Sequence, residues 1–232
     1  MPDAPIEVTI VMPVFNERLR LERAVDALLA AQVSDNLELL IVDDGSSDGT
    51  REILRERAWP PEVRVIYHER NRGKGAAIRT ALAEARGLYT TIMDADLEYE
   101  PTDIPTLLSP LRSGLAQAVF GTRGFEAHSA YSFWYVVGNR SVTFFANFLF
   151  NSWVSDMMTG QKAMATELFR SLDLDASGFA IEAEITARLL RRGVRIYEVP
   201  ITYTTRSREE GKKLTALDGV RVICTLLRCR VV

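Results

Sequence analysis

Acidic side chains cluster at two places in the chain, and one of these clusters has the residue types and spacing to bind a divalent cation. One comprises residues 43–50 and begins with two adjacent aspartates, and the other is Asp94-Ala95-Asp96, with Glu98 close behind. Residues two apart in an extended chain point the same way, so three carboxylates could converge on one ion. An isolated Asp-x-Asp more often ends a turn or caps a helix, but the presence of the other cluster reverses that preference. The sequence therefore predicts a cation site at Asp94, Asp96 and Glu98.

These clusters belong to a region that alternates short β-rich runs with helical patterns. Four apolar runs predict strands, at residues 8–14, 37–42, 63–67 and 89–93. The segments between them show helical spacing, at residues 17–32, 49–58 and 74–86. This alternation predicts an α/β fold with a mainly parallel sheet flanked by helices. Ligands bind such sheets at the carboxyl ends of the strands, which is where both acidic clusters are expected.

Four motifs together resemble those of the family 2 glycosyltransferases of the GT-A fold. They are Pro13-x-x-Asn16-Glu17, Asp43-Asp44-Gly45-Ser46-x-Asp48-Gly49-Thr50, Asn71-x-Gly73-Lys74-Gly75 and Asp94-x-Asp96. More narrowly, nearly the whole chain is similar to the polyprenyl (dolichyl) phosphate sugar synthases of that family. The resemblance implies a Rossmann-like GT-A domain. It also implies inverting transfer of a hexose from a nucleotide sugar, GDP-mannose or UDP-glucose, to a polyprenyl phosphate.

The resemblance also assigns roles to individual residues. Those expected to contact the nucleotide sugar are Pro13, Phe15, Asn16, Glu17, Asp43, Asp44, Lys74, Asp94, Ala95, Arg206 and Lys212. Those expected to hold Mg²⁺ or Mn²⁺ are Asp94, Asp96 and Glu98, although mannosyl members commonly carry Gln in place of Glu98. The expected catalytic residues are Asp96, Asp156, Arg123 and Arg140, with both arginines on the acceptor phosphate because guanidinium groups bind phosphate bidentately.

Three functions remain open. The first two are enzymatic and differ in whether the acceptor needs a general base. A phosphate monoester has a second pKa of about 6, so it is largely ionised near neutral pH without a general base. A soluble hydroxyl acceptor would need a base, for which Asp156 is the candidate. A non-catalytic nucleotide-sugar-binding protein is the third possibility, and the presence of Asp94, Asp96 and Arg123 argues against it.

The second half of the chain has a different composition. Residues 131–153 contain nine aromatic side chains, and residues 206–230 carry a net charge of +4 while the rest of the chain carries −7. Helices are expected at residues 181–192 and from about residue 214, with a strand at 194–199, so the chain ends in an amphipathic helical region. Trp and Tyr favour membrane interfaces. The aromatic segment therefore predicts either peripheral membrane contact or a homodimer interface.

Composition limits the remaining possibilities. A net charge of −3 argues against a nucleic-acid partner. Two histidines without a nearby cysteine pair argue against a zinc site. No apolar run approaches the length of a membrane span, and the N-terminus lacks a signal pattern. We expect a single domain over residues 1–232, with a nucleotide-sugar half (1–125) and an acceptor half (126–232), located in the cytoplasm and peripheral to the inner face of the membrane.

Overall fold

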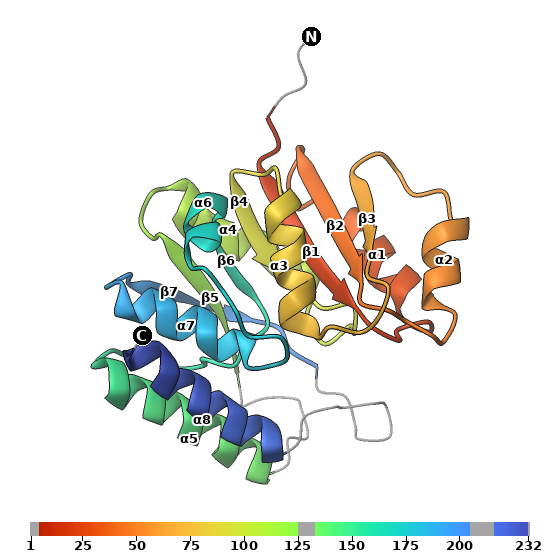
Figure 1. The fold of residues 1–232 in the computed structure, drawn as a ribbon. Helices are drawn as coiled ribbons and strands as arrows, with labels where there is room; N and C mark the ends of the chain where they lie inside the picture. The colour runs from red at the N-terminus through yellow and green to blue at the C-terminus, as the bar shows by residue number, and fades with distance from the viewer. Residues whose placement is uncertain (1–4, 125–132, 205–215, 232) are drawn as a thin grey trace.

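The computed structural model describes residues 5–124, 133–204 and 216–231. Seven strands form one sheet. They are β1 (Val8–Val14), β2 (Leu37–Asp43), β3 (Val63–Tyr67), β4 (Tyr89–Ile92), β5 (Ala118–Arg123), β6 (Lys162–Ala165) and β7 (Ile196–Ile201). Their order across the sheet is β3-β2-β1-β4-β6-β5-β7 (Figure 1). Strand β6 runs antiparallel to its neighbours β4 and β5, and the other pairings in this sheet are parallel.

The helices form layers on both faces of this sheet. They are α1 (Leu21–Ala30), α2 (Thr50–Glu56), α3 (Lys74–Glu84), a 3₁₀ turn η1 (Pro101–Asp103), α4 (Ile104–Arg112), α5 (Phe133–Phe150), α6 (Thr166–Ser171), α7 (Ile181–Arg191) and α8 (Ala216–Val231). One buried apolar cluster joins the sheet to α1 and α4, and a second joins it to α3, α6 and α7. A third cluster packs α5 and α8 against α7, so these two helices form an outer layer (Figure 1).

The α/β prediction is confirmed, and alternation along β1 shows why this strand is almost continuously apolar. Ile10 and Met12 face one apolar cluster, while Val11 between them faces the other. A strand covered on both faces is apolar at nearly every position, and the exception in β1 is Thr9, whose buried hydroxyl donates to Glu38. The antiparallel β6 was not predicted, because it has only four residues and begins with a lysine.

The order of the strands determines where a ligand site is expected. The chain moves outward from β1 through β2 to β3, then returns to place β4 on the other side of β1. Open α/β sheets bind ligands at the carboxyl ends of the strands where the order reverses in this way. The loops after β1 and β4 meet at that point.

Helix α5 presents polar residues inward and aromatic residues outward. Its buried side chains are Asn139, Thr143, Ala146 and Asn147. Large apolar side chains that are 69% to 77% exposed lie on α5 and just after it: Phe133, Trp134, Phe144, Phe148 and Trp153. The inward polar groups bind the loop after the helix: Asn147 exchanges two hydrogen bonds with the Val154 backbone, and the Thr143 hydroxyl accepts one from the Met157 amide. Helix α5 is therefore amphipathic, with an apolar face that points outward.

Among the helices in the described ranges, none combines the length and hydropathy needed to cross a bilayer.

Candidate active site

The loops after β1 and β2 are linked by hydrogen bonds between their side chains and backbones. The Asn16 amide donates to the Ser46 hydroxyl, and the Asn16 side-chain oxygen accepts from the Ser47 amide at 2.9 Å. The Glu17 amide donates to the Thr50 hydroxyl at 3.0 Å. These bonds fix the first two predicted nucleotide-contacting loops relative to each other. Pro13 and Phe15 are both half-buried beside them.

Asp43 and Asp44 are buried, with 0% and 2% of their surface exposed. Asp43 accepts hydrogen bonds from Arg51 and the Ser46 amide. Asp44 accepts from the backbone amides of Arg72 and Gly73 at 2.9 and 2.7 Å and forms a third bond with His68. Both side chains therefore hold loops of the protein together. Their contact with a nucleotide stays a prediction.

Gly45 allows the β2 loop to approach the next loop closely. It has a positive φ of 77°, and an added Cβ would lie 2.4 Å from the carbonyl carbon of Arg70. A side chain at this position would separate the two loops.

The Asp-x-Asp motif follows β4 and lies nearer to solvent. The Asp94 side chain is 21% exposed and pairs with the Lys74 ammonium at 2.7 Å. Asp96 is half-buried and accepts a hydrogen bond from the Glu98 amide, while Ala95 between them is buried. Leu97 has a positive φ of 63°, so the chain turns here and does not stay extended.

This turn separates the three carboxylates that the sequence predicted would converge. Glu98 lies mostly buried and accepts a hydrogen bond from the Tyr203 hydroxyl at 2.6 Å. Within the described ranges, no group of three His, Cys, Asp or Glu side chains is placed to hold a metal ion. The expected three-carboxylate cluster is therefore not present in this geometry.

The donor set still fits Mg²⁺ or Mn²⁺. Mg²⁺ is usually bound by one or two carboxylates together with substrate phosphates, and seldom by a cage of protein ligands. Asp94 and Asp96 supply hard oxygen ligands just after the carboxyl end of β4. They would hold such a cation once a diphosphate provided the remaining oxygens.

A buried series of ion pairs leads from this motif into the interior. Lys74 binds Asp94 and also Glu182, whose nearer oxygen lies 3.0 Å from the ammonium. Glu182 in turn pairs with Lys162, which is fully buried. Burial alone would lower the pKa of Lys74, but the two carboxylates raise it above its ordinary value. Lys74 is therefore a fixed positive charge beside the Asp-x-Asp motif.

Arg123 and Asp156 form a second buried ion pair. Asp156 is 1% exposed and accepts from Arg123 Nε at 2.6 Å and Nη2 at 2.8 Å. The Asn139 amide of α5 donates to the same carboxylate at 3.1 Å. Burial alone would raise the pKa of Asp156, but the Arg123 guanidinium holds it below its ordinary value. Asp156 thus occupies the bidentate edge of Arg123 that the sequence assigned to the acceptor phosphate.

Three tyrosines connect this pair to the acidic motif. Tyr135 accepts a hydrogen bond from Arg123 Nη1, and the Arg123 guanidinium lies over the Tyr203 ring at 5.1 Å. The Tyr203 and Tyr99 ring centroids are 5.1 Å apart. A Cβ on Gly160 would lie within 3.2 Å of both the Tyr99 hydroxyl and the Asp94 carboxylate. The Asp-x-Asp motif and the Arg123–Asp156 pair are therefore neighbouring parts of one site.

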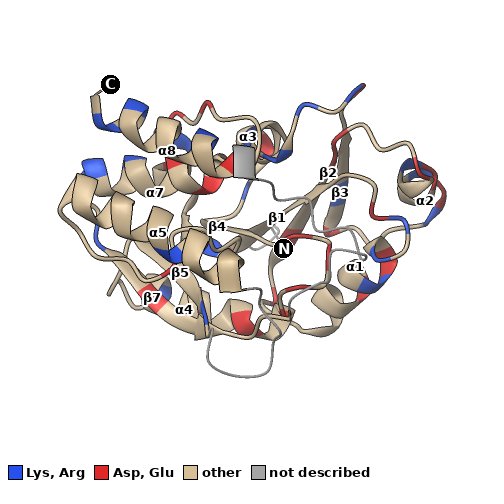
Figure 2. Ribbon diagram, turned by 90° about the horizontal axis from the view of Figure 1, so that it is seen from below, with Lys and Arg blue, Asp and Glu red and all other residues tan. Residues whose placement is uncertain are grey.

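The remaining predicted residues are placed differently. Arg140 is exposed on α5, next to the inward-pointing Asn139. Arg206 and Lys212 lie outside the described residues. Seen toward the carboxyl ends of the strands, the acidic residues gather in the central loops, and basic residues mark α7 and α8 (Figure 2).

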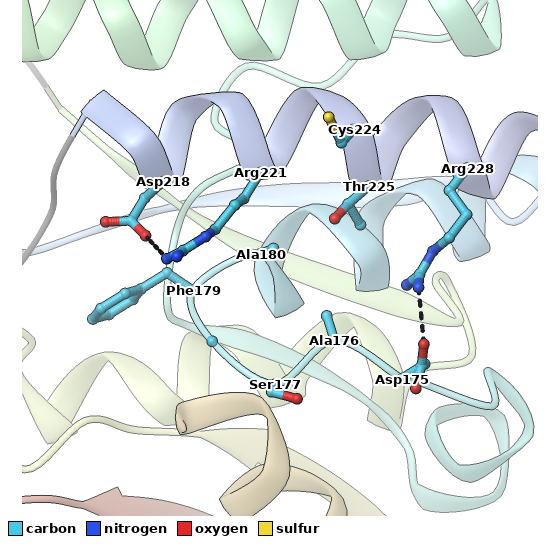
Figure 3. Close-up of a pocket in the computed structure, with 11 residues that line it drawn as sticks. Asp175, Ala176, Ser177, Phe179, Ala180, Asp218, Arg221, Cys224, Thr225 and Arg228 are labelled. Atoms are coloured by element: carbon cyan, nitrogen blue, oxygen red, sulfur yellow. Dashed lines mark hydrogen bonds and ion pairs between the residues drawn. The ribbon is translucent and has the colours of Figure 1, made fainter. Parts of the chain in front are cut away.

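A pocket of about 860 Å³ lies outside this site, between residues 175–180 and α8 (Figure 3). Its lining includes two ion pairs, Arg221 with Asp218 and Arg228 with Asp175. Of the predicted site residues that the structure describes, none lines this pocket.

Several side chains of the site were not predicted as functional. They are Tyr99, Tyr135, Asn139, Lys162, Glu182, Glu198 and Tyr203. Asn139 is next to the predicted Arg140, and Glu182 lies at the start of the helix expected at residues 181–192, so their positions in the sequence could have drawn attention to them. Single tyrosines and a lysine in a four-residue strand carry no such signal.

Comparisons with known proteins identify the family. Residues 9–173 match the family model described as glycosyl transferase family 2. Glycosyltransferase AglJ of Haloferax volcanii is 30% identical over 95% of this chain and 68% of its own length. Dolichol-phosphate mannosyltransferase of Pyrococcus furiosus is 28% identical over 89% of this chain, which spans 59% of that relative.

A solved structure shows the same fold. Glucosyl-3-phosphoglycerate synthase of Mycobacterium tuberculosis, in complex with Mn²⁺, UDP-glucose and phosphoglyceric acid, superposes with a TM-score of 0.74. The alignment covers 98% of this chain and 80% of that one at 23% identity. With the family model spanning most of the chain and AglJ matching nearly all of it, the protein belongs to glycosyl transferase family 2.

Proposed function

We propose that this glycosyltransferase moves a hexose from a nucleotide sugar, GDP-mannose or UDP-glucose, to a polyprenyl phosphate, with inversion at the anomeric carbon. The name of the Pyrococcus furiosus relative supports a lipid phosphate acceptor and a mannosyl donor. The Mycobacterium tuberculosis synthase, solved with Mn²⁺ and UDP-glucose, supports a divalent cation and a nucleotide-sugar donor.

The observation that carries the acceptor class is the enclosure of Asp156. Its two carboxylate oxygens accept bonds from Arg123 and Asn139, and it is 1% exposed. Its lowered pKa makes it a weak proton acceptor. A phosphate monoester needs no base, because it arrives largely ionised. This geometry therefore favours a phosphate acceptor over a soluble hydroxyl.

At the donor end, the residues of the first half would hold the diphosphate of the nucleotide sugar. Asp94 and Asp96 would bind Mg²⁺ or Mn²⁺, and Lys74 would add a positive charge beside them. The bound cation would stabilise the negative charge on the departing nucleoside diphosphate. An acceptor oxygen forms its bond to the anomeric carbon as the bond to the diphosphate breaks, which inverts the configuration.

At the acceptor end, Arg140 is the exposed cation for the lipid phosphate. Arg123 is buried, its charge is balanced by Asp156 and its Nη1 donates to the Tyr135 hydroxyl, so its role in this proposal is to order these side chains. Residues 126–232 form the acceptor half in this proposal.

The outer layer of α5 and α8 would bring the enzyme to the membrane. Exposed apolar side chains follow a helical stripe on α8 as they do on α5: Val220, Ile223, Leu227 and Val231. Arg221, Arg228 and Arg230 on the same helix suit an anionic surface. We place the enzyme in the cytoplasm, peripheral to the inner face of the membrane. A homodimer contact through the same apolar stripe is the competing use of this surface.

A screen of radiolabelled GDP-mannose and UDP-glucose against polyprenyl phosphate, with and without Mn²⁺, tests the proposal. The expected product is a labelled lipid that forms only with the cation. Transfer to soluble hydroxyl acceptors alone would favour the alternative with Asp156 as base. Absence of both transfer and donor hydrolysis, with donor binding retained, would favour a non-catalytic nucleotide-sugar-binding protein.

A further inference from the structure

Four charged side chains form a continuous series from the protein interior to the Asp-x-Asp motif. In order they are Lys162 on β6, Glu182 on α7, Lys74 on α3 and Asp94 after β4. Each oxygen of Glu182 has its own lysine: one lies 2.5 Å from Lys162 Nζ and the other 3.0 Å from Lys74 Nζ. Lys74 is therefore shared between two carboxylates, one deep in the protein and one at the site.

Backbone contacts fix the start of α3, which carries Lys74, relative to the loop that leads into α7, which carries Glu182. The Gly75 amide donates to the Ser177 carbonyl at 2.7 Å, which docks the start of α3 on the loop that leads into α7. A Cβ on Gly75 would lie 2.0 Å from the Ala176 carbonyl oxygen. The Lys74 side chain thus has a rigid base, and only its flexible stem is free to change partners.

We infer that Glu182 is a positioning residue that keeps the Lys74 ammonium within reach of the donor diphosphate while Lys74 exchanges between Asp94 and that diphosphate. This inference rests on the proposed nucleotide-sugar donor.

Charge balance explains why such an exchange is expected. With Asp94 included, the series contains two positive and two negative side chains. A divalent cation on Asp94 would repel Lys74 from that carboxylate, because bound ions are the largest local charges in a site. Glu182, already balanced by Lys162, would retain Lys74 nearby. The displaced Lys74 ammonium and the cation would then together balance the negative charge of a diphosphate.

A purely structural role makes a different prediction. If the series served only to satisfy buried charges, removing Lys74 would leave Asp94 and Glu182 less ordered and would weaken every ligand that binds beside them. Under our inference Lys74 competes with the cation for Asp94 but attracts the diphosphate. Removal of Lys74 should therefore tighten binding of the cation and weaken binding of the diphosphate.

The test measures binding of Mn²⁺ alone by electron paramagnetic resonance, and binding of GDP and UDP with Mn²⁺ by calorimetry. For Lys74→Met we expect about threefold tighter binding of Mn²⁺ alone, and loss of about tenfold in nucleoside diphosphate affinity, as for removal of one charge-assisted hydrogen bond. For Glu182→Gln we expect a similar loss of diphosphate affinity, by about tenfold, without tighter Mn²⁺ binding.

The control is Glu38→Gln, which removes another buried carboxylate, one paired with Arg64 at the far end of β2. It should leave both affinities at the wild-type values, and thermal unfolding checks that each variant is folded. Weaker Mn²⁺ binding in Lys74→Met, or wild-type diphosphate affinity in Glu182→Gln, would overturn the inference. If the wild-type protein bound neither GDP nor UDP, the proposed function would fail, and the Mn²⁺ measurement on Lys74→Met would still decide whether Lys74 competes for Asp94.

Discussion

The loops after β2 and β4 begin with similar acidic sequences but use their carboxylates differently. Asp43 and Asp44 are buried and accept hydrogen bonds from Arg51, His68 and three backbone amides. Asp94 and Asp96 are only partly buried, and Asp94 pairs with Lys74. A carboxylate surrounded by backbone donors maintains the fold. We expect a carboxylate that pairs with a lysine side chain to exchange that partner when a ligand binds.

The cause of this difference lies in the surroundings of each loop. Residues 70–73 cover the β2 loop: Arg70 and Asn71 approach Gly45 closely, and the amides of Arg72 and Gly73 donate to Asp44. The β4 loop lies at the reversal of strand order, where open α/β sheets bind ligands, and Asp94 and Asp96 are only partly buried there. Position in the fold therefore decides how far donor groups of the protein enclose an aspartate.

The largest effect on activity is expected from Asp96→Asn. This change removes an anionic oxygen at the open edge while keeping the size of the side chain. We expect transfer to fall about 10³-fold, since a metal's Lewis-acid contribution amounts to several kcal/mol. The free energy of unfolding should stay within about 0.5 kcal/mol of wild type. Steady-state kinetics and urea unfolding measure the two quantities, and a variant with full activity would exclude Asp96 as a metal ligand.

Arg123→Met tests whether Asp156, like Asp43 and Asp44, is a buried carboxylate that stabilises the fold. Removing one partner of a buried ion pair leaves an uncompensated charge, so we expect a loss of about 3 kcal/mol in the free energy of unfolding at pH 7. In the wild-type protein the lowered pKa of Asp156 contributes stability above pH about 4, which is lost as the pH falls through the folded-state value.

In the variant, burial without the guanidinium would raise the pKa of Asp156 instead. Protonation would remove the penalty as the pH falls from that raised pKa toward about 4, and below about 4 the wild-type protein loses its own contribution from Asp156. The difference in stability between wild type and Arg123→Met should therefore shrink over this whole range. Urea unfolding at several pH values measures this. A difference independent of pH would mean that the lost stability comes from packing and not from the ion pair.

Asp44→Asn should mainly destabilise the fold. The amide that replaces one carboxylate oxygen does not accept hydrogen bonds, so at least one of the Arg72 and Gly73 amides would lose its partner. We expect a loss of about 2 kcal/mol in the free energy of unfolding. The matched control is Asp48→Asn in the same loop, which is less buried and should cost less. Equal losses in the two variants would contradict the special role of Asp44.

The sequence predicts the positions of these loops better than their chemistry. Apolar runs located β1 and β3 to the residue, and the Asp-x-Asp motif was correctly expected after β4. Periodicity could not show that Leu97 turns the chain and separates Glu98 from the two aspartates. Nor could it show that Lys162 pairs with Glu182 from another element, because such contacts depend on tertiary packing.

Asp156→Asn separates the two acceptor classes through the pH profile of transfer. We expect a loss of about tenfold or less, since an orienting carboxylate contributes less than the 10² to 10⁴ of a general base. The acidic limb of the wild-type profile should follow the acceptor phosphate near pH 6 and persist in the variant. Loss of that limb would identify Asp156 as the titrating base.

Helix α5 buries polar residues and exposes aromatic ones, and we expect the exposed aromatic residues to contribute to membrane binding. This effect should be smaller than those above. Replacing Phe144 and Phe148 with serine should weaken binding to anionic vesicles about tenfold, through loss of buried apolar surface. The matched control replaces Leu88 and Leu115, which are similarly exposed elsewhere. Unchanged vesicle binding, together with conversion of a dimer to a monomer, would assign this surface to a homodimer.

The most direct test compares Asp96→Asn and Asp44→Asn in two assays, hexose transfer to polyprenyl phosphate and the free energy of unfolding. We predict opposite outcomes: Asp96→Asn loses transfer with wild-type stability, and Asp44→Asn loses stability while folded molecules keep transfer within about tenfold of wild type. If both variants lost the same property to the same extent, the division between scaffold and ligand carboxylates would be wrong.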